Sequence, residues 1–233
     1  MLTENELVML NNNIWYSHLP PLFQNFILEQ AKHLLVARDE VVFRHGDHFD
    51  GIYAVLKGKV RLGYIDIEGN ESVAAIVEPI MWFGEISLVD QQPRSHHAIA
   101  TEKSTILKIS HLAIENLLGR HPQFWFHIAQ LTSQKLRLAF LELISIHTLN
   151  IQQRLAQRLL FILNGYGNHL NIQQNIIQLS QEQLAQMLMC SRQTVNQALQ
   201  QLEKQNIVVL SFRKIEILNH AELHRIAHTS THF

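Results

Sequence analysis

The sequence contains almost no cysteine and no long apolar run. Cys190 is the single cysteine among 233 residues, so the chain can form neither an internal disulfide nor an iron–sulfur cluster held by about four of its own thiolates. No apolar stretch reaches the roughly 20 residues that a membrane-spanning helix needs. The N-terminus carries Glu4 and Glu6 instead of a basic segment ahead of an apolar one. We therefore expect a cytoplasmic protein without a membrane partner.

Charge is also sparse, and it is unevenly distributed. Charged residues make up 17% of the chain and the formal net charge is −1. Of the 19 Lys/Arg and 20 Asp/Glu, seven and four lie from Asn150 onward, which leaves twelve and sixteen before it. The formal charge is thus +3 in the C-terminal part and −4 in the N-terminal part. A mildly basic part attached to an acidic one fits DNA binding, although +3 does not establish it alone.

The region from Val36 to Ile109 has the pattern of an all-β domain. Short β-branched runs alternate with Gly and Asp, and the turn signals recur at roughly 8 to 12-residue spacing. Such spacing is typical of a β-sandwich or barrel. Ahead of this region, Thr3 and Glu6 form a capping-box pattern that predicts a helix near residue 4, and Pro21 to about His33 predicts another.

A long apolar helix is expected from about Pro122 to Thr148. Its apolar positions recur every three or four residues, at Leu136, Ala139 or Phe140, Leu143 and Ile146. A helix with this many apolar residues needs burial on more than one side. It is either a core helix or one strand of a parallel coiled coil with a second copy. Asn150 can cap the helix that follows.

The stretch from Leu179 to Asn206 reads as two short helices with a tight break. Ser180 and Ser191 can cap them. The second helix has an apolar stripe of Val195, Ala198, Leu199 and Leu202. Its other side is polar and suits base edges in a DNA major groove, consisting of Arg192, Gln193, Thr194, Asn196, Gln197 and Gln200. Two short strands after it, joined by a turn at residues 211–213, predict a wing. A helical hairpin with a merely solvated second helix is the alternative.

Residues 83–95, FGEISLVDQQPRS, combine side chains suited to an anionic ligand with hydroxyls. Gly84 permits close approach of a backbone, and Glu85 can accept hydrogen bonds from hydroxyls. Arg94 offers a planar fork that matches a phosphate, and Ser95 adds a hydroxyl. Each residue alone is ordinary on a protein surface.

Two of these stretches resemble one known family. CSRQTVNQALQQLEKQNIV, residues 190–208, resembles the helix-turn-helix of the catabolite activator and fumarate–nitrate regulator (CRP/FNR) family of bacterial transcription factors. Residues 83–95 resemble the phosphate-binding cassette of cyclic-nucleotide-binding domains. The resemblance implies an α+β chain, with a jelly-roll, cyclic-nucleotide-binding-like β-barrel at 1–120. A long dimerisation helix and hinge would follow at 121–149, and a winged helix-turn-helix at 150–233.

The resemblance also implies a function. The chain would be a homodimeric transcription regulator and not an enzyme. Its affinity for a two-fold symmetric double-stranded DNA operator would be set by a small effector in the barrel, and RNA polymerase would be a further partner. The sequence shows no nucleophile–base pair that would favour an enzyme on a β-barrel.

The implied effector contacts lie in two places. Glu85 would bind a ribose hydroxyl, and Arg94 and Ser95 a cyclic phosphate, beside Gly84. In cyclic AMP-responsive members a Thr-Ser pair contacts adenine. When the two sequences are aligned without gaps from the middle of the long helix into the reader domain, this pair falls on Ala139 and Phe140. The base-reading half of the pocket is therefore altered. Cyclic AMP or cyclic GMP is the implied effector; another small molecule, or none with a purely structural barrel, stays open.

The implied DNA contacts lie on the second helix of the reader. Arg192, Gln193 and Gln197 occupy the base-contacting positions, while Ser191 and Thr194 lie near phosphates. Met189 stands where the family usually has Gly in the turn, so the turn needs either negative φ or some strain.

Two further constellations lie outside these sites. His220, His224, His228 and His232 are spaced for a metal-binding helix face, but a polar tail fits them better, and we expect no metal site. Cys190 stands near a helix N-terminus, where thiol pKa values fall. It is either a redox-sensitive thiol or, as the family implies, a structural cysteine.

The reader assignment makes a prediction for Arg192. If Arg192 reads a guanine, Arg192→Ala should cost roughly 1 to 3 kcal/mol of binding and relax preference at one base pair. Affinities for a panel of single-base operator variants check this. Equal loss on every sequence would make Arg192 a phosphate contact instead.

Overall fold

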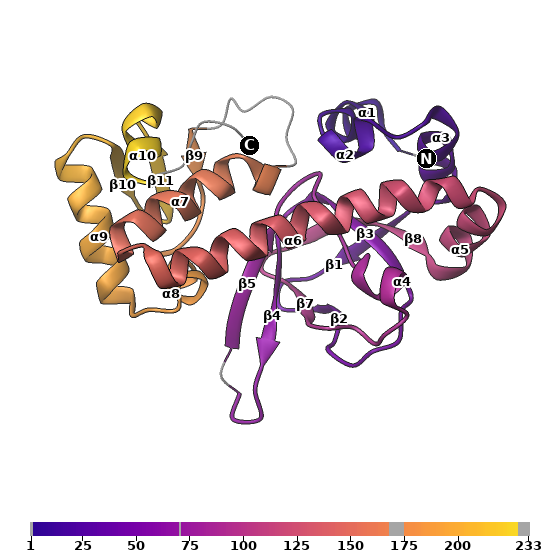
Figure 1. Ribbon diagram of the computed structural model, residues 1–233, viewed down its shortest axis with the longest axis horizontal. Coiled ribbons are helices and arrows are strands. Elements are labelled where there is room, and N and C mark those ends of the chain that lie inside the picture. The colour runs from indigo at the N-terminus through magenta and orange to yellow at the C-terminus, as the bar shows by residue number, and fades with distance from the viewer. Residues whose placement is uncertain (1, 70, 168–174, 228–233) are drawn as a thin grey trace. The chain divides into compact units, whose positions relative to one another are not determined.

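The computed structural model describes residues 2–69, 71–167 and 175–227. The chain forms two compact units, Met1–Lys135 and Leu136–Phe233, and each is described by itself. The long helix α6 (Trp125–Thr148) belongs to both, because its first turns pack in the first unit and its later turns extend into the second (Figure 1).

Three short helices precede the sheets of the first unit. They are α1 (Glu4–Asn11), α2 (Ile14–Ser17) and α3 (Pro21–Gln30). The capping box expected at Thr3 and Glu6 is confirmed. The second expected helix ends at Gln30, earlier than predicted, because the chain from Lys32 enters a strand that pairs with β8.

The β region of the first unit consists of two four-stranded antiparallel sheets in the described residues, as the sequence predicted. One has the order β1 (Lys32–Val36), β8 (Ser104–Ser110), β3 (Gly51–Lys57) and β6 (Trp82–Phe83). The other has the order β2 (Val41–Phe43), β7 (His97–Ala100), β4 (Val60–Ile65) and β5 (Glu71–Val77). A short helix, α4 (Ile86–Asp90), lies in the segment between β6 and β7 (Figure 1).

The apolar core of this unit joins its helices to its sheets. It includes side chains of α1–α3, of β3 and β8, and of α5 (His111–Arg120), and it reaches the start of α6 at Ile128 and Leu131. The 3₁₀ turn η1 (Pro122–Phe124) connects α5 to α6. Trp15 Nε1 donates to the carbonyl of His127 at 2.7 Å. The first turns of α6 are therefore held to the β domain, which fixes where Lys135 lies.

The second unit is a winged helix-turn-helix. Its helices are α7 (Ile151–Leu163), α8 (Gln181–Leu188), α9 (Arg192–Lys204) and α10 (His220–Ile226), with a 3₁₀ turn η2 at Gly165–Gly167. The strands β10 (Val208–Ser211), β11 (Lys214–Ile217) and β9 (Ile176–Ile177) form a three-stranded sheet in that order. The predicted wing and the Asn150 cap of α7 are both confirmed. Among all helices in the described ranges, none is long and apolar enough to cross a bilayer.

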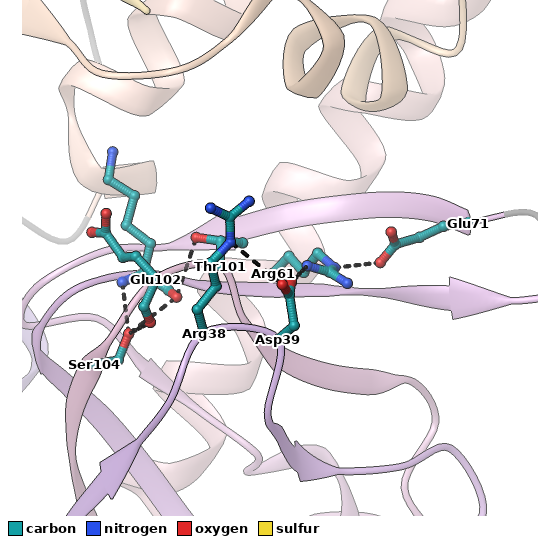
Figure 2. Close-up of polar contacts among 8 residues, drawn as sticks. Arg38, Asp39, Arg61, Glu71, Thr101, Glu102 and Ser104 are labelled. Carbon is teal, nitrogen blue, oxygen red and sulfur yellow. Dashed lines mark hydrogen bonds and ion pairs between the residues drawn. The ribbon is translucent and has the colours of Figure 1, made fainter.

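Two polar clusters brace the β domain, one between β4 and β5 and one at the turn before β8 (Figure 2). Arg61 Nε lies 2.5 Å from Glu71 Oε1 and its Nη1 lies 3.4 Å from Asp39 Oδ1. At the β7–β8 turn, Ser104 Oγ accepts from the Lys59 amide at 3.1 Å and donates to the Glu102 carbonyl at 2.8 Å. The second cluster leaves no room beside Gly58, where a Cβ would lie 2.3 Å from Ser104 Oγ.

Gly58 and Gly69 form a matched pair for testing this packing, because both have φ +85° but only Gly58 is crowded. We expect Gly69→Ala to cost about 1 to 2 kcal/mol for the left-handed backbone. Gly58→Ala should cost roughly 1 to 3 kcal/mol more for the overpacking. Urea unfolding followed by tryptophan fluorescence measures both, since the three tryptophans, Trp15, Trp82 and Trp125, all lie in the first unit. Equal losses would contradict the crowding.

Candidate effector pocket and nucleic-acid interface

Arg94 is buried at the centre of the cassette and is held by the protein itself. Its side chain is only 2% exposed. Nη1 donates to the Gly84 carbonyl at 2.7 Å, and Nη2 donates to Asp50 Oδ1 at 2.6 Å and to the Gly51 carbonyl at 2.7 Å. The guanidinium carbon also lies 4.3 Å from the centre of the Phe43 ring, within the range of a cation–π contact. The arginine expected to bind phosphate is thus also a structural link between β3 and the cassette.

Asp50 is the counter-ion of this arginine. Its Oδ2 accepts from Tyr53 Oη at 2.6 Å and from Lys108 Nζ at 2.5 Å. Burial opposes ionisation of Asp50, but the hydrogen bonds from Lys108, Tyr53 and Arg94 outweigh it and lower the pKa of the carboxyl below its usual value. Burial and the adjacent Asp50 raise the pKa of Tyr53. The pair is therefore charged, and Tyr53 neutral, at neutral pH.

Residue 84 has to be a glycine because the Arg94 side chain packs against it. It has φ +89°, and a Cβ there would lie 3.1 Å from Arg94 Nη1 and 3.2 Å from Tyr53 Cδ2. A side chain at this position would strain the backbone and push the guanidinium from its place.

Glu85 is fully buried and only half paired. Its Oε2 accepts from Lys135 Nζ of α6 at 2.5 Å. Its Oε1 is buried and has no hydrogen-bond partner among the residues that the structure describes. A buried carboxylate oxygen without a donor is costly, so this atom is a place where a ligand hydroxyl would be stabilised.

His96 faces the same cassette. Its Nδ1 lies 2.9 Å from Ser95 Oγ, and its ring centre lies 5.7 Å from that of Phe43. Its Nε2 is buried and finds no partner in the described part of the chain, and the same holds for Nε of Arg94. Burial lowers the pKa of His96 to about 4, and the charge of Lys135 adds to the effect. The ring is therefore neutral at neutral pH.

The structure brings together part of the predicted effector set. Gly84, Glu85 and Arg94 lie in one buried cluster, while Ser95 is exposed beside His96. Ala139 and Phe140 are exposed residues of α6 in the second unit, so their contact with an effector stays a prediction.

Sequence reasoning missed Lys135 and gave His96 no role. Lys135 looks like any solvated lysine on a helix, and only the fold shows that it reaches Glu85. The available signal for His96 was its place directly after the cassette, next to a second histidine, His97. The chain itself has a Thr-Ser pair on this helix, Thr132-Ser133, within three residues of Lys135. Thr132 shares the helix face of Lys135 by i, i+3 spacing.

The helix-turn-helix has the predicted caps. Ser180 forms a capping box with Gln183, and Ser191 Oγ accepts from the Thr194 amide at 3.1 Å. Met189 adopts the left-handed conformation, with φ 51° and ψ 49°. Of the two predicted solutions for this turn, the chain therefore uses strain, at a cost of roughly 1 to 2 kcal/mol. The Met189 side chain is exposed, so no packing clash adds to it.

Helix α9 presents the predicted faces. Its apolar stripe of Val195, Ala198, Leu199 and Leu202 is buried. Arg192, Gln193 and Gln197 are exposed on the other side, and Ser191 is exposed at the cap with Thr194 partly covered. The faces are confirmed, whereas the individual DNA contacts stay predictions.

A groove of about 660 Å³ runs between this helix pair and the wing. It is lined by Leu179–Glu182, Arg192, Leu199 and Leu210–Ile215. At the wing tip Phe212 is 92% exposed. Arg213 adopts φ 54° beside it, and Lys214 forms an ion pair with Glu216 at 3.0 Å. These wing cations were not among the predicted DNA contacts, although the turn that carries them was predicted.

Neither of the two other constellations forms a site among the residues that the structure describes. Burial raises the pKa of the Cys190 thiol, which is the opposite of the activated thiol that a redox role requires. His220 Nε2 lies 2.8 Å from Asn175 Oδ1, and His228 and His232 lie outside the described residues. Within residues 2–69, 71–167 and 175–227, no group of three or more His, Cys, Asp or Glu side chains could hold a metal ion.

Comparison with known proteins agrees with both units. Residues 34–121 match the cyclic nucleotide-binding domain and residues 153–226 match the Crp-like helix-turn-helix domain. The "Cyclic AMP receptor protein" of Thermus thermophilus is 30% identical over 210 residues, covering 90% of this chain and 94% of that protein. The "CRP-like cAMP-activated global transcriptional regulator" of Mycobacterium tuberculosis is 26% identical, covering 82% and 85%.

The fold comparison points the same way. The solved structure of FixK2 from Bradyrhizobium japonicum has a TM-score of 0.75 at 21% identity, covering 86% of this chain and 99% of that chain. The chain therefore belongs to the CRP/FNR family of transcription regulators, with a cyclic-nucleotide-binding β domain, a long helix and a DNA-binding helix-turn-helix. Its named relatives are transcription regulators and not enzymes.

The buried His96 predicts a pH dependence of stability. Its pKa is about 4 in the folded state against about 6.5 when unfolded, so the unfolded state binds more protons between these values. The free energy of unfolding of the first unit should then fall as pH drops from about 6.5 to about 4, by up to roughly 3 kcal/mol. His96→Gln should remove this fall, whereas His48→Gln, at an exposed histidine of the same unit, should keep it. Tryptophan-monitored unfolding gives both slopes, and identical slopes for wild type and His96→Gln would contradict a buried neutral ring.

Proposed function

We propose that this chain is a homodimeric DNA-binding regulator whose operator affinity is set by a small anionic effector bound in the cassette. The observation that carries this is a set of three buried polar atoms, Glu85 Oε1, Arg94 Nε and His96 Nε2, each without a partner among the described residues. Buried polar atoms in proteins are nearly always hydrogen-bonded. Their clustering in one cassette fits a site that is completed by a ligand.

The three atoms specify the chemistry of that ligand. Glu85 Oε1 needs a donor, such as a hydroxyl, and Arg94 Nε needs an acceptor. When the Ser95 hydroxyl donates to Nδ1 of His96, the ring proton lies on Nε2, which then also needs an acceptor. A ligand that offers a hydroxyl beside a group with several acceptor oxygens satisfies all three. A ribose with a cyclic phosphate has this arrangement.

The charge of the cassette matches a monoanion. It brings three cations and two carboxylates together and so has an excess of one positive charge. These are Arg94, Lys108 and Lys135 against Asp50 and Glu85. A cyclic phosphodiester carries one negative charge, so cyclic AMP or cyclic GMP would neutralise the cluster. The matching cyclic nucleotide-binding domain and the name of the Thermus relative support the same choice.

The base end of the effector has two candidate contacts on α6. Thr132 and Ser133 lie in the turn that precedes Lys135, and Thr132 shares the helix face from which Lys135 reaches Glu85. We favour this pair as the base contact, because Lys135 ties its turn to the cassette. Ala139 and Phe140, which would offer stacking without hydroxyls, are the alternative.

Lys135 connects the effector site to the helix that we propose as the dimer interface. A hydroxyl that binds Glu85 would change the Lys135–Glu85 pair and so bias the position of α6. Beyond Lys135, α6 exposes large apolar side chains: Leu136, Phe140, Leu143, Ile144 and Ile146. Packing against a second copy would bury them. The domain limits proposed from the sequence, 1–120, 121–149 and 150–233, assign this helix to dimerisation.

The DNA contacts follow from α9 and the wing. Arg192, Gln193 and Gln197 would read bases in the major groove, and Ser191 and Thr194 would contact phosphates. Arg213 and Lys214 line the groove beside Arg192 and would hold the phosphate backbone. Two copies would present two recognition helices to half-sites about one helical turn apart.

Calorimetric titration with cyclic AMP and cyclic GMP tests the effector. Glu85→Gln keeps the shape of the side chain but removes its charge. It should weaken binding by about fivefold to tenfold, since a hydrogen bond to a charged acceptor is worth roughly 1 kcal/mol more than one to an amide. Glu71→Gln is the matched control, because Glu71 pairs with Arg61 on β4, and it should bind like wild type. No binding of either nucleotide by the wild-type protein would favour a structural barrel or another ligand.

Salt dependence tests the wing. Lys214→Ala should weaken binding to all operators about equally and lower the slope of log K against log salt by about one, because one phosphate contact is lost. Fluorescence anisotropy at several salt concentrations measures the slope. An unchanged slope together with altered base preference would show that Lys214 does not act as a phosphate contact.

A further inference from the structure

Two amide side chains link the two helices of the reader. Gln181, in the first turn of α8, donates from Nε2 to Oδ1 of Asn196 on α9 at a distance of 3.0 Å. The bond is partly shielded from solvent, and Gln181 also lines the groove between α8, Arg192 and the wing. The Gln181–Asn196 hydrogen bond thus lies between the groove and the polar face of α9.

Asn196 lies within the arc of α9 that is proposed to read bases. It is four residues after Arg192 and three after Gln193, so by helical geometry it lies on the stripe between them. The buried stripe of α9 faces away from this arc. If Arg192, Gln193 and Gln197 reach base edges, Asn196 reaches the same groove.

The link changes what Asn196 can recognise. A free asparagine presents an acceptor and a donor and pairs with adenine through N7 and N6. Here the carbonyl oxygen accepts from Gln181 and is directed toward α8, so the NH2 group, with two donors, is the branch of the amide left for DNA. Guanine presents two acceptors, N7 and O6, in the major groove.

We propose that Gln181 and Asn196 form a specificity pair in which Gln181 orients the Asn196 amide so that it selects guanine instead of adenine. Gln181 is a positioning residue and Asn196 is the base contact. The proposal rests on the proposed role of α9 as the recognition helix. It predicts one guanine in each half-site whose recognition depends on Asn196.

Exchanging the donor of Gln181 for an acceptor is the sharpest test. In Gln181→Glu the carboxylate cannot donate, so the Asn196 amide should turn over, donate Nδ2 to residue 181, and present its carbonyl to the DNA. Preference at that base pair should then move from guanine toward a base with an exposed amino group, cytosine or adenine. Asn196→Ala should make the same position degenerate, with about a tenfold loss of discrimination there and none elsewhere.

Selection from a pool of randomised DNA duplexes by the full-length protein, with and without cyclic AMP, measures these preferences. Gln186→Glu, which adds the same charge elsewhere on α8, is the control and should keep the guanine. Unchanged preference in Asn196→Ala would overturn the base contact, and unchanged preference in Gln181→Glu would overturn the positioning role. A wild-type protein that selects no sequence would overturn the recognition helix itself, and with it this proposal. Changes confined to one base pair would support it.

Discussion

The sensor unit depends on the ion pair between the buried Arg94 and the partly exposed Asp50. A buried guanidinium is tolerated only when its charge is paired. Here Asp50 and two carbonyls accept from the two terminal nitrogens, and the Phe43 ring packs against the guanidinium. The main chain of Arg94 is also tied down, because its amide donates to the Asp47 carbonyl and its carbonyl accepts from the Gly46 amide, each at 2.8 Å. The pair therefore fixes the loop before β3 against the cassette. The positions of Gly84 and Glu85 follow from this contact.

The reader unit uses a buried and a partly buried arginine in a similar way. Arg154 and Arg158 of α7 donate to the carbonyls of Leu188 and Met187 at the end of α8. Arg158 also pairs with Glu142 of α6, and burial raises the pKa of that carboxyl. These bonds satisfy the last carbonyls of α8 and hold the turn at Met189, so the start of α9 is fixed by the same contacts that join α6 to α7.

Local patterns in the sequence predicted the elements well. The capping residues Thr3, Asn150 and Ser180, the apolar stripe of α9 and the turn signals of the β region depend on neighbours within a few residues, and the structure confirms them. The end of α3 was predicted too late, because pairing of β1 with β8 overrides local helix propensity.

Such local patterns could not predict contacts between residues that are distant in the sequence. The Lys135–Glu85 pair spans 50 residues and the Arg94–Asp50 pair spans 44. Glu85 and Arg94 belong to the cassette motif, but their partners Lys135 and Asp50 have no local signature. The left-handed Met189 shows a different limit of local patterns. The sequence identified the constraint on the turn, but choosing between negative φ and strain required the packing around α8.

Coupling between the effector site and the DNA reader is tested most directly by one measurement. Cyclic AMP is titrated into the full-length protein with and without a saturating duplex obtained by selection. If binding at one site biases the reader, linkage requires the nucleotide dissociation constant to change when DNA is bound, by a factor of about 5 to 150 for couplings of ordinary size. An identical dissociation constant with and without DNA would contradict the account.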